Sequence, residues 1–225
     1  MNYNEINEVL SFLNKQARLK KKKSCFLFGT TKKRINQNYY LTPNRESQKT
    51  IYAGAILYGN RIAKKLAKKI DGKVNYLFVD IEKKSSNKKD ALTNIERATK
   101  ATIKKSIVKN YKPNDITVDS IGNFIQDYFR KDLRGVGGKK ILILGTGNIG
   151  SKVAIRLLES GGNVFLFRRN KNKLKKISEV LNIIKPKHTK SRSITISSSK
   201  LKFEDYDVII GCSDNKIKFK KIKRL

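Results

Sequence analysis

The sequence contains one histidine and two cysteines, and this scarcity excludes several kinds of catalytic site. His188 alone cannot build a zinc site that needs several histidine ligands. Cys25 and Cys212 lie far apart, each beside an apolar run typical of a strand, so they form no metal-ligand cluster. Two isolated cysteines suit a reducing compartment, and we therefore expect a cytoplasmic protein with no bound metal.

Long apolar runs are also missing. No run approaches the roughly 20 residues of a membrane span, although 38% of the residues are hydrophobic, so we expect no membrane partner. The first residues, with Glu5 and Glu8, lack the charged-then-apolar order of a secretory signal. The 225 residues suffice for one large domain or two small ones with real cores.

Acidic residues are few: 18 Asp and Glu stand against 52 Lys and Arg, which gives a net charge of +34. Such a charge attracts polyanions. The excess is spread over both halves of the chain, and aromatic residues do not alternate with the basic ones as a nucleic-acid stacking platform requires. Basic runs at 20–23 and 216–224 could touch RNA, and we expect any such polyanion contact to be nonspecific.

The segment 139–170 carries the strongest pattern of the chain. It predicts a strand, a glycine-rich turn, a helix and a second strand, which is the opening of a dinucleotide-binding βαβ unit. Residues 141–144 form a short apolar run, typical of a parallel strand buried on both faces. Gly145, Gly147 and Gly150 follow it in G-x-G-x-x-G spacing.

Each glycine has a separate predicted role. Gly145 permits the tight turn, Gly147 lets the backbone approach a pyrophosphate, and Gly150 lets the next helix pack closely against the strand. That helix carries an apolar stripe, and its N-terminus would direct free N–H groups at the phosphates. The cofactor contacts predicted from this loop are Gly145, Thr146, Gly147, Asn148, Ile149 and Gly150.

The end of the second strand distinguishes between two cofactors. NAD-binding units usually place an acidic residue there, which accepts hydrogen bonds from the ribose 2′-hydroxyl. This chain has Arg168, Arg169 and Asn170 after Phe167. A guanidinium offers charge and paired donors to a 2′-phosphate, so the sequence favours NADP over NAD as the cofactor.

The remaining pattern predicts an α/β protein with two lobes, in which a smaller α/β lobe (1–134) precedes a C-terminal Rossmann-type parallel sheet (135–225). In the first lobe we expect helices over 3–19, 47–70, 91–111 and 121–133, with strands over 24–29 and 74–81. Residues 50–55 could instead begin as a strand, 31–46 and 83–89 are predicted loops, and 116–118 is a short strand or a helix lead-in. Pro113 would stop the third helix, and glycines 135, 137 and 138 would form a hinge-like linker. In the second lobe we expect a helix over 171–184 and strands over 193–197 and 207–211.

This order of elements resembles the superfamily of shikimate dehydrogenase, glutamyl-tRNA reductase and the methylene-tetrahydrofolate or methylene-tetrahydromethanopterin dehydrogenases. LGTGNIG followed by FRRN is similar to the family's glycine loop and its Asn-Arg-Thr clamp for the 2′-phosphate, which implies that Arg169 is the clamp arginine. DYDVIIGCS at 205–213 is similar to the strand that brings a small turn beside the nicotinamide, which implies cofactor contacts at Cys212 and Ser213.

Two further segments of the resemblance imply catalytic residues. ITVDSIGNFI at 116–125 is similar to the segment before the interlobe helix and implies a substrate-binding aspartate at Asp119. LFVDIEKK at 77–84 is similar to a strand that ends in a catalytic lysine, here Lys84 or Lys83. A partly desolvated lysine can exchange a proton with a hydroxyl or carbonyl group. Two plainer interpretations stay open: Lys84 faces solvent in a charged loop, and Asp119 caps the helix that follows.

The chain also departs from the family pattern. Phe78 and Glu82 replace an asparagine and a proline, and GTTKKR lacks the Ser-x-Ser pair that holds the substrate carboxylate in shikimate dehydrogenases. Thr30 and Thr31 are the nearest hydroxyl groups. The sequence continues only briefly after Ser213, without the last two Rossmann strands or the returning helix, so we expect a Rossmann domain shortened at its C-terminus.

The first functional hypothesis is an NADP-dependent oxidoreductase that transfers a hydride to or from a small polar substrate, as a shikimate dehydrogenase does. The alternatives are a methylene-tetrahydrofolate or methylene-tetrahydromethanopterin dehydrogenase-like enzyme, and a non-catalytic relative that binds nucleotides or RNA. A homodimer is one assembly open to the chain. The sequence leaves the substrate and the direction of the reaction open.

Overall fold

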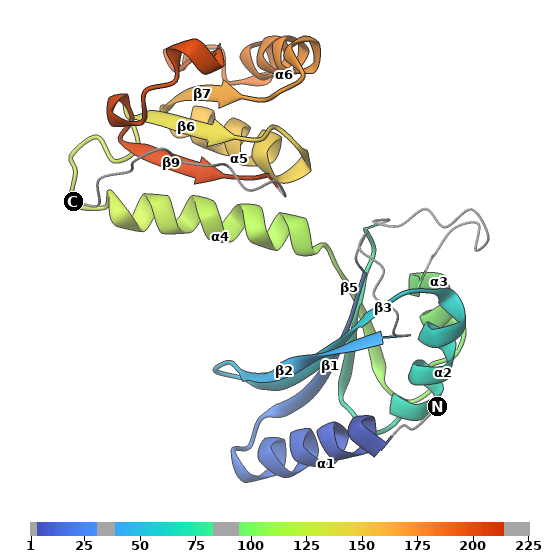
Figure 1. The fold of residues 1–225 in the computed structure, drawn as a ribbon. Coiled ribbons are helices and arrows are strands. Elements are labelled where there is room, and N and C mark those ends of the chain that lie inside the picture. The colour runs from blue at the N-terminus through green and yellow to red at the C-terminus, as the bar shows by residue number, and fades with distance from the viewer. Residues whose placement is uncertain (1–3, 31–38, 83–94, 214–225) are drawn as a thin grey trace. The chain divides into compact units, whose positions relative to one another are not determined.

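A computed structural model describes residues 4–30, 39–82 and 95–213, which divide into two compact units, Met1–Pro113 and Asn114–Leu225 (Figure 1). Both units are of the α/β class, as predicted. The first has a five-stranded sheet and the second a four-stranded one within the described residues, so the first is not the smaller of the two. No described helix is long and apolar enough to cross a membrane.

The first unit is built around a mixed sheet with the strand order β2-β3-β1-β4-β5, in which only β2 is antiparallel to its neighbour. Its elements in chain order are α1 (Asn4–Leu19), β1 (Lys23–Thr30), β2 (Tyr39–Glu46), β3 (Thr50–Leu57), α2 (Asn60–Ile70), β4 (Tyr76–Asp80), α3 (Ile95–Lys100) and β5 (Ile107–Tyr111). Central β1 is buried along almost its whole length, as expected for a parallel strand covered on both faces.

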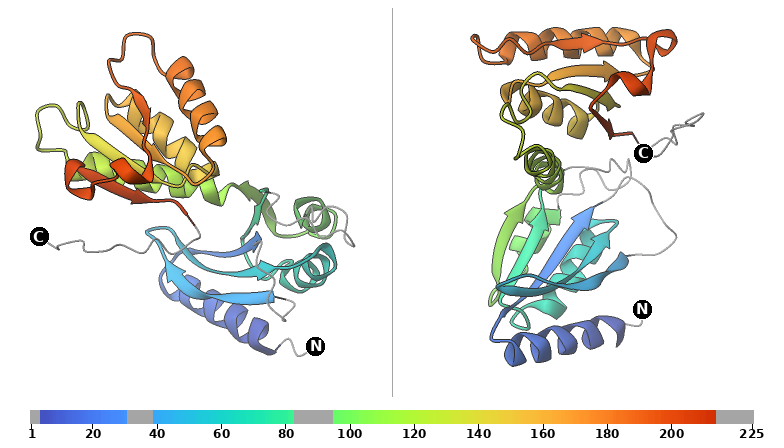
Figure 2. Two further views of the ribbon diagram at one scale, coloured as in Figure 1. Left: turned by 45° about the horizontal axis from the view of Figure 1, so that its top comes forward. Right: turned by 90° about the vertical axis from the view of Figure 1, so that its left-hand side faces the viewer.

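The helices of this unit form because their apolar residues recur at helical spacing. Ile6, Leu10, Leu13 and Ala17 of α1 are buried against the sheet, and α1 lies beside its strands in both Figure 1 and Figure 2. The exposed side of α2 is basic, and its apolar side enters the same core.

Three sequence predictions for the first unit were wrong. Residues 39–46 were expected in a loop but form edge strand β2, whose register shifts between Thr42 and Arg45 around Pro43. Proline is tolerated there because an edge strand has one unpaired side and a bulge needs fewer ladder hydrogen bonds. Thr50–Leu57 is β3, the alternative to a helical start, because this apolar run pairs with β1 along its whole length.

The predicted helix over 91–111 is the third error. Only Ile95–Lys100 is helical within its described part, and Ile107–Tyr111 is strand β5, paired in parallel with β4. Pro113 begins a helix, α4 (Pro113–Tyr128), where its missing N–H costs nothing. The local helix propensity of 101–111 gave way to the pairing that completes the sheet.

The second unit contains a parallel sheet with the strand order β8-β7-β6-β9. After α4 come β6 (Lys140–Leu144), α5 (Asn148–Glu159), β7 (Asn163–Phe167), α6 (Lys171–Ile184), β8 (Ser193–Thr195), two short 3₁₀ turns (Ser198–Lys200 and Phe203–Asp205) and β9 (Val208–Gly211). β7 and then β8 lie on one side of β6, and β9 lies on the other side. The carboxyl ends of β6 and β9 therefore form the topological switch point at which such sheets bind ligands.

The core of this unit confirms the predicted pattern. All four residues 141–144 of β6 are fully buried, and the stripe Val153, Ala154, Leu157 and Leu158 of α5 packs on the sheet with them. The helix predicted over 171–184 is α6 with the same bounds. The strands predicted near 193–197 and over 207–211 are β8 and β9, each slightly shorter than expected.

The second unit begins at Asn114, earlier than the predicted boundary at 135. Val118 and Ile125 of α4 are buried in the same core as β6, so this helix belongs to the Rossmann-type unit. The glycines that were expected to form a linker belong to it too. Gly138 donates its N–H to the carbonyl of Gly161, and Val136 is buried in the core, so this segment is a folded turn and not a hinge.

Candidate dinucleotide-binding site

The turn after β6 is one that only glycine fits. Gly145 has a φ of +105°, in the left-handed region that side chains disfavour. A Cβ at this position would also lie 2.7 Å from the carbonyl oxygen of Cys212. Conformation and space both demand glycine here, so the predicted turn role of Gly145 is confirmed.

Gly150 and Gly147 differ in what surrounds them. A Cβ on Gly150 would lie 2.0 Å from the carbonyl oxygen of Gly145, so the close packing predicted for this glycine is against the turn after β6, where the prediction had named the strand itself. Nothing lies within 4 Å of the Cβ position of Gly147 among the described residues, and Gly147 is exposed. The backbone at Gly147 is therefore open to an approaching group, while its contact with a pyrophosphate stays a prediction.

Helix α5 starts beside this opening. Its N-cap is Gly147, which has no side chain to cover the free N–H groups of the first turn, so these groups are available to an anion. Thr146 is 2% exposed, and its hydroxyl has no hydrogen-bond partner among the described residues. A buried unpaired hydroxyl, an open glycine and an uncapped helix start all fit a bound pyrophosphate.

The end of β9 lies against the same loop. Cys212 donates its N–H to the carbonyl of Leu144, 2.8 Å away, and Ser213 follows it next to Gly145. The structure thus brings the predicted Cys212 and Ser213 to the glycine loop, across the switch point between β6 and β9. Burial raises the pKa of the Cys212 thiol, so the group is neutral at physiological pH.

The residues after β7 divide into three different environments. Arg168 is half-buried, and its Nη1 donates to the carbonyl oxygen of Thr146 in the glycine loop, 2.9 Å away. Arg169 is exposed. Asn170 is the N-cap of α6, where its Oδ1 accepts the N–H of Lys173 at 2.9 Å. Sequence reasoning assigned all three to the cofactor without seeing the cap or the hydrogen bond to the loop.

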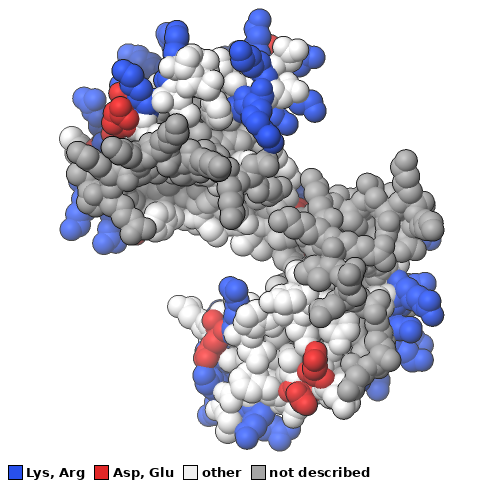
Figure 3. All heavy atoms as spheres, in the orientation of Figure 1, with Lys and Arg blue, Asp and Glu red and all other residues white. Residues whose placement is uncertain are grey.

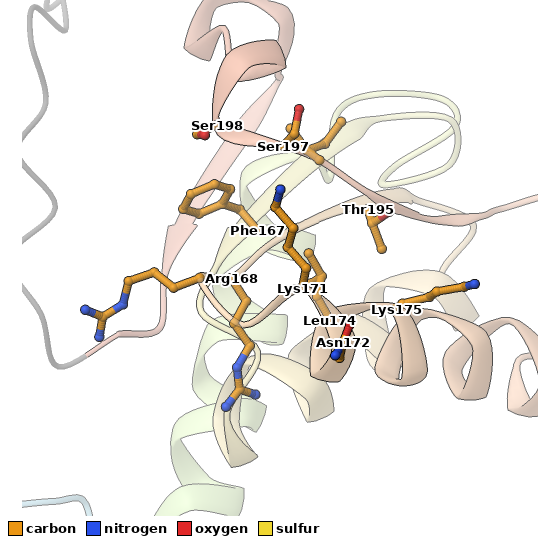
Figure 4. A pocket seen from close by; sticks show the side chains of 11 residues that line it. Phe167, Arg168, Lys171, Asn172, Leu174, Lys175, Thr195, Ser197 and Ser198 are labelled. Atoms are coloured by element: carbon orange, nitrogen blue, oxygen red, sulfur yellow. The ribbon is translucent and has the colours of Figure 1, made fainter.

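A cavity of about 580 Å³ lies beyond the end of β7 (Figure 4). Its walls are the end of β7, the first turns of α6 and the segment after β8. In the view of Figure 4, Phe167, Lys171 and Ser197 gather at one end, and Thr195 and Lys175 lie at the other. The lining comprises Phe167, Arg168, Arg169, Lys171, Asn172, Leu174, Lys175, Thr195, Ile196, Ser197 and Ser198, four of them basic and none acidic.

Sequence reasoning missed Lys171, Lys175 and the residues after β8. The sequence held one signal for the two lysines: they are four positions apart on the helix predicted over 171–184, so they share a face. Lys175 also lies 4.0 Å from Glu179, in an exposed pair that is expected to hold it weakly. The contribution of 195–198 depends on the pairing of β8 with β7 and had no local signal.

The basic residues of the chain are not confined to this cavity. In the view of Figure 3, lysine and arginine side chains lie on both units, with few acidic side chains among them. This agrees with a charge excess spread over the chain. Contact with RNA or another polyanion stays a prediction.

Of the predicted catalytic residues, Asp119 lies within the described part of the chain and Lys84 does not. Asp119 lies in the middle of α4, with its side chain 64% exposed and ion-paired to Arg156 of α5, so the interpretation of Asp119 as a helix cap is wrong. The guanidinium of Arg156 also donates to Oδ1 of Asn123 at 2.7 Å. Lys84 and its alternative Lys83 lie outside the described residues, so Lys84 stays a prediction.

In the first unit, the ends of β1 and β4 are tied together. Thr30 donates its N–H and its hydroxyl to the buried carboxylate of Asp80, at 3.2 and 2.9 Å. The N–H of Glu82 donates to the other oxygen of Asp80 at 2.8 Å. Thr30 takes the sequence position closest to the family's substrate-holding serines, and its hydroxyl is already hydrogen-bonded within this unit. Nearby, burial and then the charges of Asp80 and Glu82 raise the pKa of the Tyr111 phenol. Thr31 lies outside the described residues.

Comparison with known proteins gives a partial match. Residues 140–224 match the family described as NADP oxidoreductase, coenzyme F420-dependent, which covers less than half of the chain. No curated protein matches the sequence. Together with the strand order, the family match gives the second unit the Rossmann-type fold of NADP-binding oxidoreductases.

Solved structures with a similar fold include enzymes of different classes. L-tryptophan dehydrogenase from Nostoc punctiforme is 12% identical with a TM-score of 0.40, over 73% of this chain and 44% of its own. A shikimate dehydrogenase in complex with NADP⁺ is 17% identical with a TM-score of 0.39, over 86% and 67%. The catalytic subunit of aspartate transcarbamoylase from M. jannaschii is 13% identical with a TM-score of 0.41, over 94% and 70%. This chain therefore spans less than half the length of the tryptophan dehydrogenase, and these likenesses concern the fold alone.

Proposed function

We propose that the chain is an NADP-dependent oxidoreductase that transfers a hydride to or from a small polar substrate, as shikimate dehydrogenases do. The observation that carries the proposal is the basic cavity at the end of β7, next to an open glycine loop. The family match over 140–224 supports the cofactor and the reaction class. The bound dinucleotide would supply or accept the hydride.

The glycine loop would hold the pyrophosphate. The free N–H groups at the start of α5 and the positive end of its dipole favour a doubly charged group at this place. Gly147 leaves room for the phosphate oxygens, and the buried hydroxyl of Thr146 gains a partner if one of them reaches it. This part of the site does not distinguish NADP from NAD.

The cavity would hold the adenosine end with its 2′-phosphate. Arg169, Lys171 and Lys175 supply three of the four positive charges in the lining, Arg168 supplies the fourth, and no lining residue is acidic. A 2′-phosphate carries close to two negative charges, and each charge-assisted hydrogen bond to it is worth about 1.5–3 kcal/mol. NAD carries a hydroxyl in place of that phosphate and gains little from the same cations.

The substrate end of the proposal depends on the family resemblance. Cys212 and Ser213 are small residues at the switch point, where the nicotinamide of a bound cofactor would lie. Lys84 would exchange the proton of the substrate hydroxyl or carbonyl, and Asp119 would hold the substrate. A lysine can serve in this way where partial desolvation lowers its pKa toward neutrality.

A direct test measures the affinities of NADP and NAD by fluorescence titration in physiological salt. We expect NADP to bind about ten- to a hundredfold more tightly, since each 1.4 kcal/mol is a factor of ten. A thermal-shift series with both dinucleotides checks that the folded protein is the species that binds. Absence of binding by either dinucleotide would defeat the proposed function. Equal affinities would defeat the assignment of NADP.

A further inference from the structure

The two arginines after β7 differ in their contacts and in their exposure to solvent. Arg168 is half-buried and its guanidinium donates to the carbonyl oxygen of Thr146 at 2.9 Å, whereas Arg169 is exposed, and both residues line the cavity. We infer that Arg168 is a positioning residue that fixes the glycine loop. It sets the affinity for either dinucleotide, whereas Arg169 and its neighbouring lysines select the 2′-phosphate. This inference rests on the proposed function.

The contact acts on a peptide group at the centre of the loop. A trans peptide is planar, so the carbonyl of Thr146 and the N–H of Gly147 point in opposite directions, and no described peptide bond is cis. By holding that carbonyl, Arg168 fixes the direction of the Gly147 N–H as well. Glycine has wide backbone freedom, so a loop with glycines at 145, 147 and 150 needs such a restraint.

Two further hydrogen bonds hold the glycine loop, but neither replaces the contact of Arg168 with Thr146. Gly145 donates its N–H to the carbonyl of Phe167 at 2.9 Å, which ties the start of the loop to the end of β7. The hydroxyl of Ser151 reaches the carbonyl of Thr146 at 3.4 Å, a long hydrogen bond. Among the described contacts, Arg168 thus provides the short and charged restraint on Thr146. A loop with its donors already oriented binds with less loss of entropy.

The consequence is a distinct binding pattern for each arginine. Arg168→Ala frees the peptide between Thr146 and Gly147, and both NADP and NAD should bind about tenfold more weakly, with their affinity ratio unchanged. Arg169→Ala should weaken NADP and leave NAD almost unaffected. Arg168→Lys keeps the charge but loses the planar fork, and we expect it to restore binding only in part.

The experiment combines titration with hydrogen exchange. NADP and NAD affinities are measured for the wild type, Arg168→Ala, Arg168→Lys and Arg169→Ala. Lys176→Ala serves as a control of equal charge change outside the cavity. Amide exchange at residues 146–149 of the protein without cofactor reports the order of the loop directly. We expect faster exchange there in Arg168→Ala, an unaltered rate in Arg169→Ala and similar melting temperatures throughout.

The outcomes separate the two proposals. A fall in NADP affinity alone in Arg168→Ala would overturn the inference and make Arg168 a ligand of the 2′-phosphate. Unchanged loop exchange would overturn it as well, and this readout needs no cofactor. Failure of the wild type to bind either dinucleotide would instead defeat the proposed function, while the exchange data would still decide whether Arg168 orders the loop.

Discussion

The Cβ position of Gly150 lies 2.0 Å from the carbonyl oxygen of Gly145, although the two glycines are five positions apart in sequence. The obstacle is backbone, which cannot rotate away as a flexible side chain would. Gly150→Ala should therefore push α5 off the turn and lower the free energy of unfolding by about 3 kcal/mol, the upper end for overpacked cores. Urea denaturation of the wild type and the variant would measure this loss.

Gly147→Ala provides the control for that experiment. Its Cβ would meet nothing within 4 Å among the described residues, and its φ of −80° suits any side chain. We expect its stability to stay within about 0.5 kcal/mol of the wild type, as for other substitutions at exposed positions. A similar loss in both variants would show that the loop tolerates no side chain at all.

Gly147→Val should abolish dinucleotide binding and leave a folded protein. The branched side chain would fill the space that the pyrophosphate is proposed to occupy, and Gly147 is extended, a conformation that valine favours. Calorimetric titration with NADP, together with a thermal melt, measures both effects. Unchanged NADP affinity in a folded variant would remove the proposed pyrophosphate site.

The glycine loop could be predicted from the sequence because its determinants are local. Gly145, Gly147 and Gly150 lie within six residues and follow a strand of four apolar residues, so spacing and composition together specify the turn. The same reasoning failed over 91–111, where β5 exists because it pairs with β4. A strand that depends on a distant partner carries little signal of its own.

Only part of the lining of the cavity beyond β7 could be predicted from the sequence, for the same reason. Arg169 was predicted because it follows a predictable strand. Residues 195–198 reach the site only because β8 pairs in parallel with β7, for example through Phe165 opposite Ile194. The direction of the Arg168 side chain was also beyond the sequence, because a guanidinium can reach either a loop carbonyl or a phosphate.

Cys212 should react slowly with alkylating reagents and should be protected by the cofactor. Burial raises the pKa of its thiol, so the reactive thiolate is scarce at pH 7–8 and becomes abundant only as the pH rises through the raised pKa. Iodoacetamide labelling followed by mass spectrometry would measure the rate against pH, in a Cys25→Ser background. NADP should slow the labelling further, because Cys212 lies beside the glycine loop. Labelling that bound NADP leaves unchanged would place the cofactor elsewhere.

Asp119→Asn should lower turnover without unfolding the protein. The carboxylate of Asp119 is largely exposed although Arg156 is partly buried, and ion pairs with an exposed member contribute about 1 kcal/mol or less to stability. Arg156→Gln breaks the same pair and leaves the carboxylate in place, so it is the matched control. A fall in kcat in Asp119→Asn alone would support the substrate role. Equal small effects in both variants would mean that Asp119 serves only its ion pair.

The preference for NADP should depend on several cations acting together, because Arg169, Lys171 and Lys175 line one cavity. Arg169→Ala should remove most of the NADP preference, and Lys175→Ala a smaller part, because Lys175 also lies near Glu179. The affinity of NAD should hardly change in either variant, since NAD carries no 2′-phosphate. The protein attracts any polyanion through its net charge of +34, so the deciding quantity is the ratio of the NADP and NAD affinities in physiological salt. Lys176→Ala removes the same charge from the neighbouring position of α6, outside the cavity lining, and should keep the wild-type ratio. Equal ratios in all four proteins would show that the cavity does not read the 2′-phosphate and that these cations are surface charge alone.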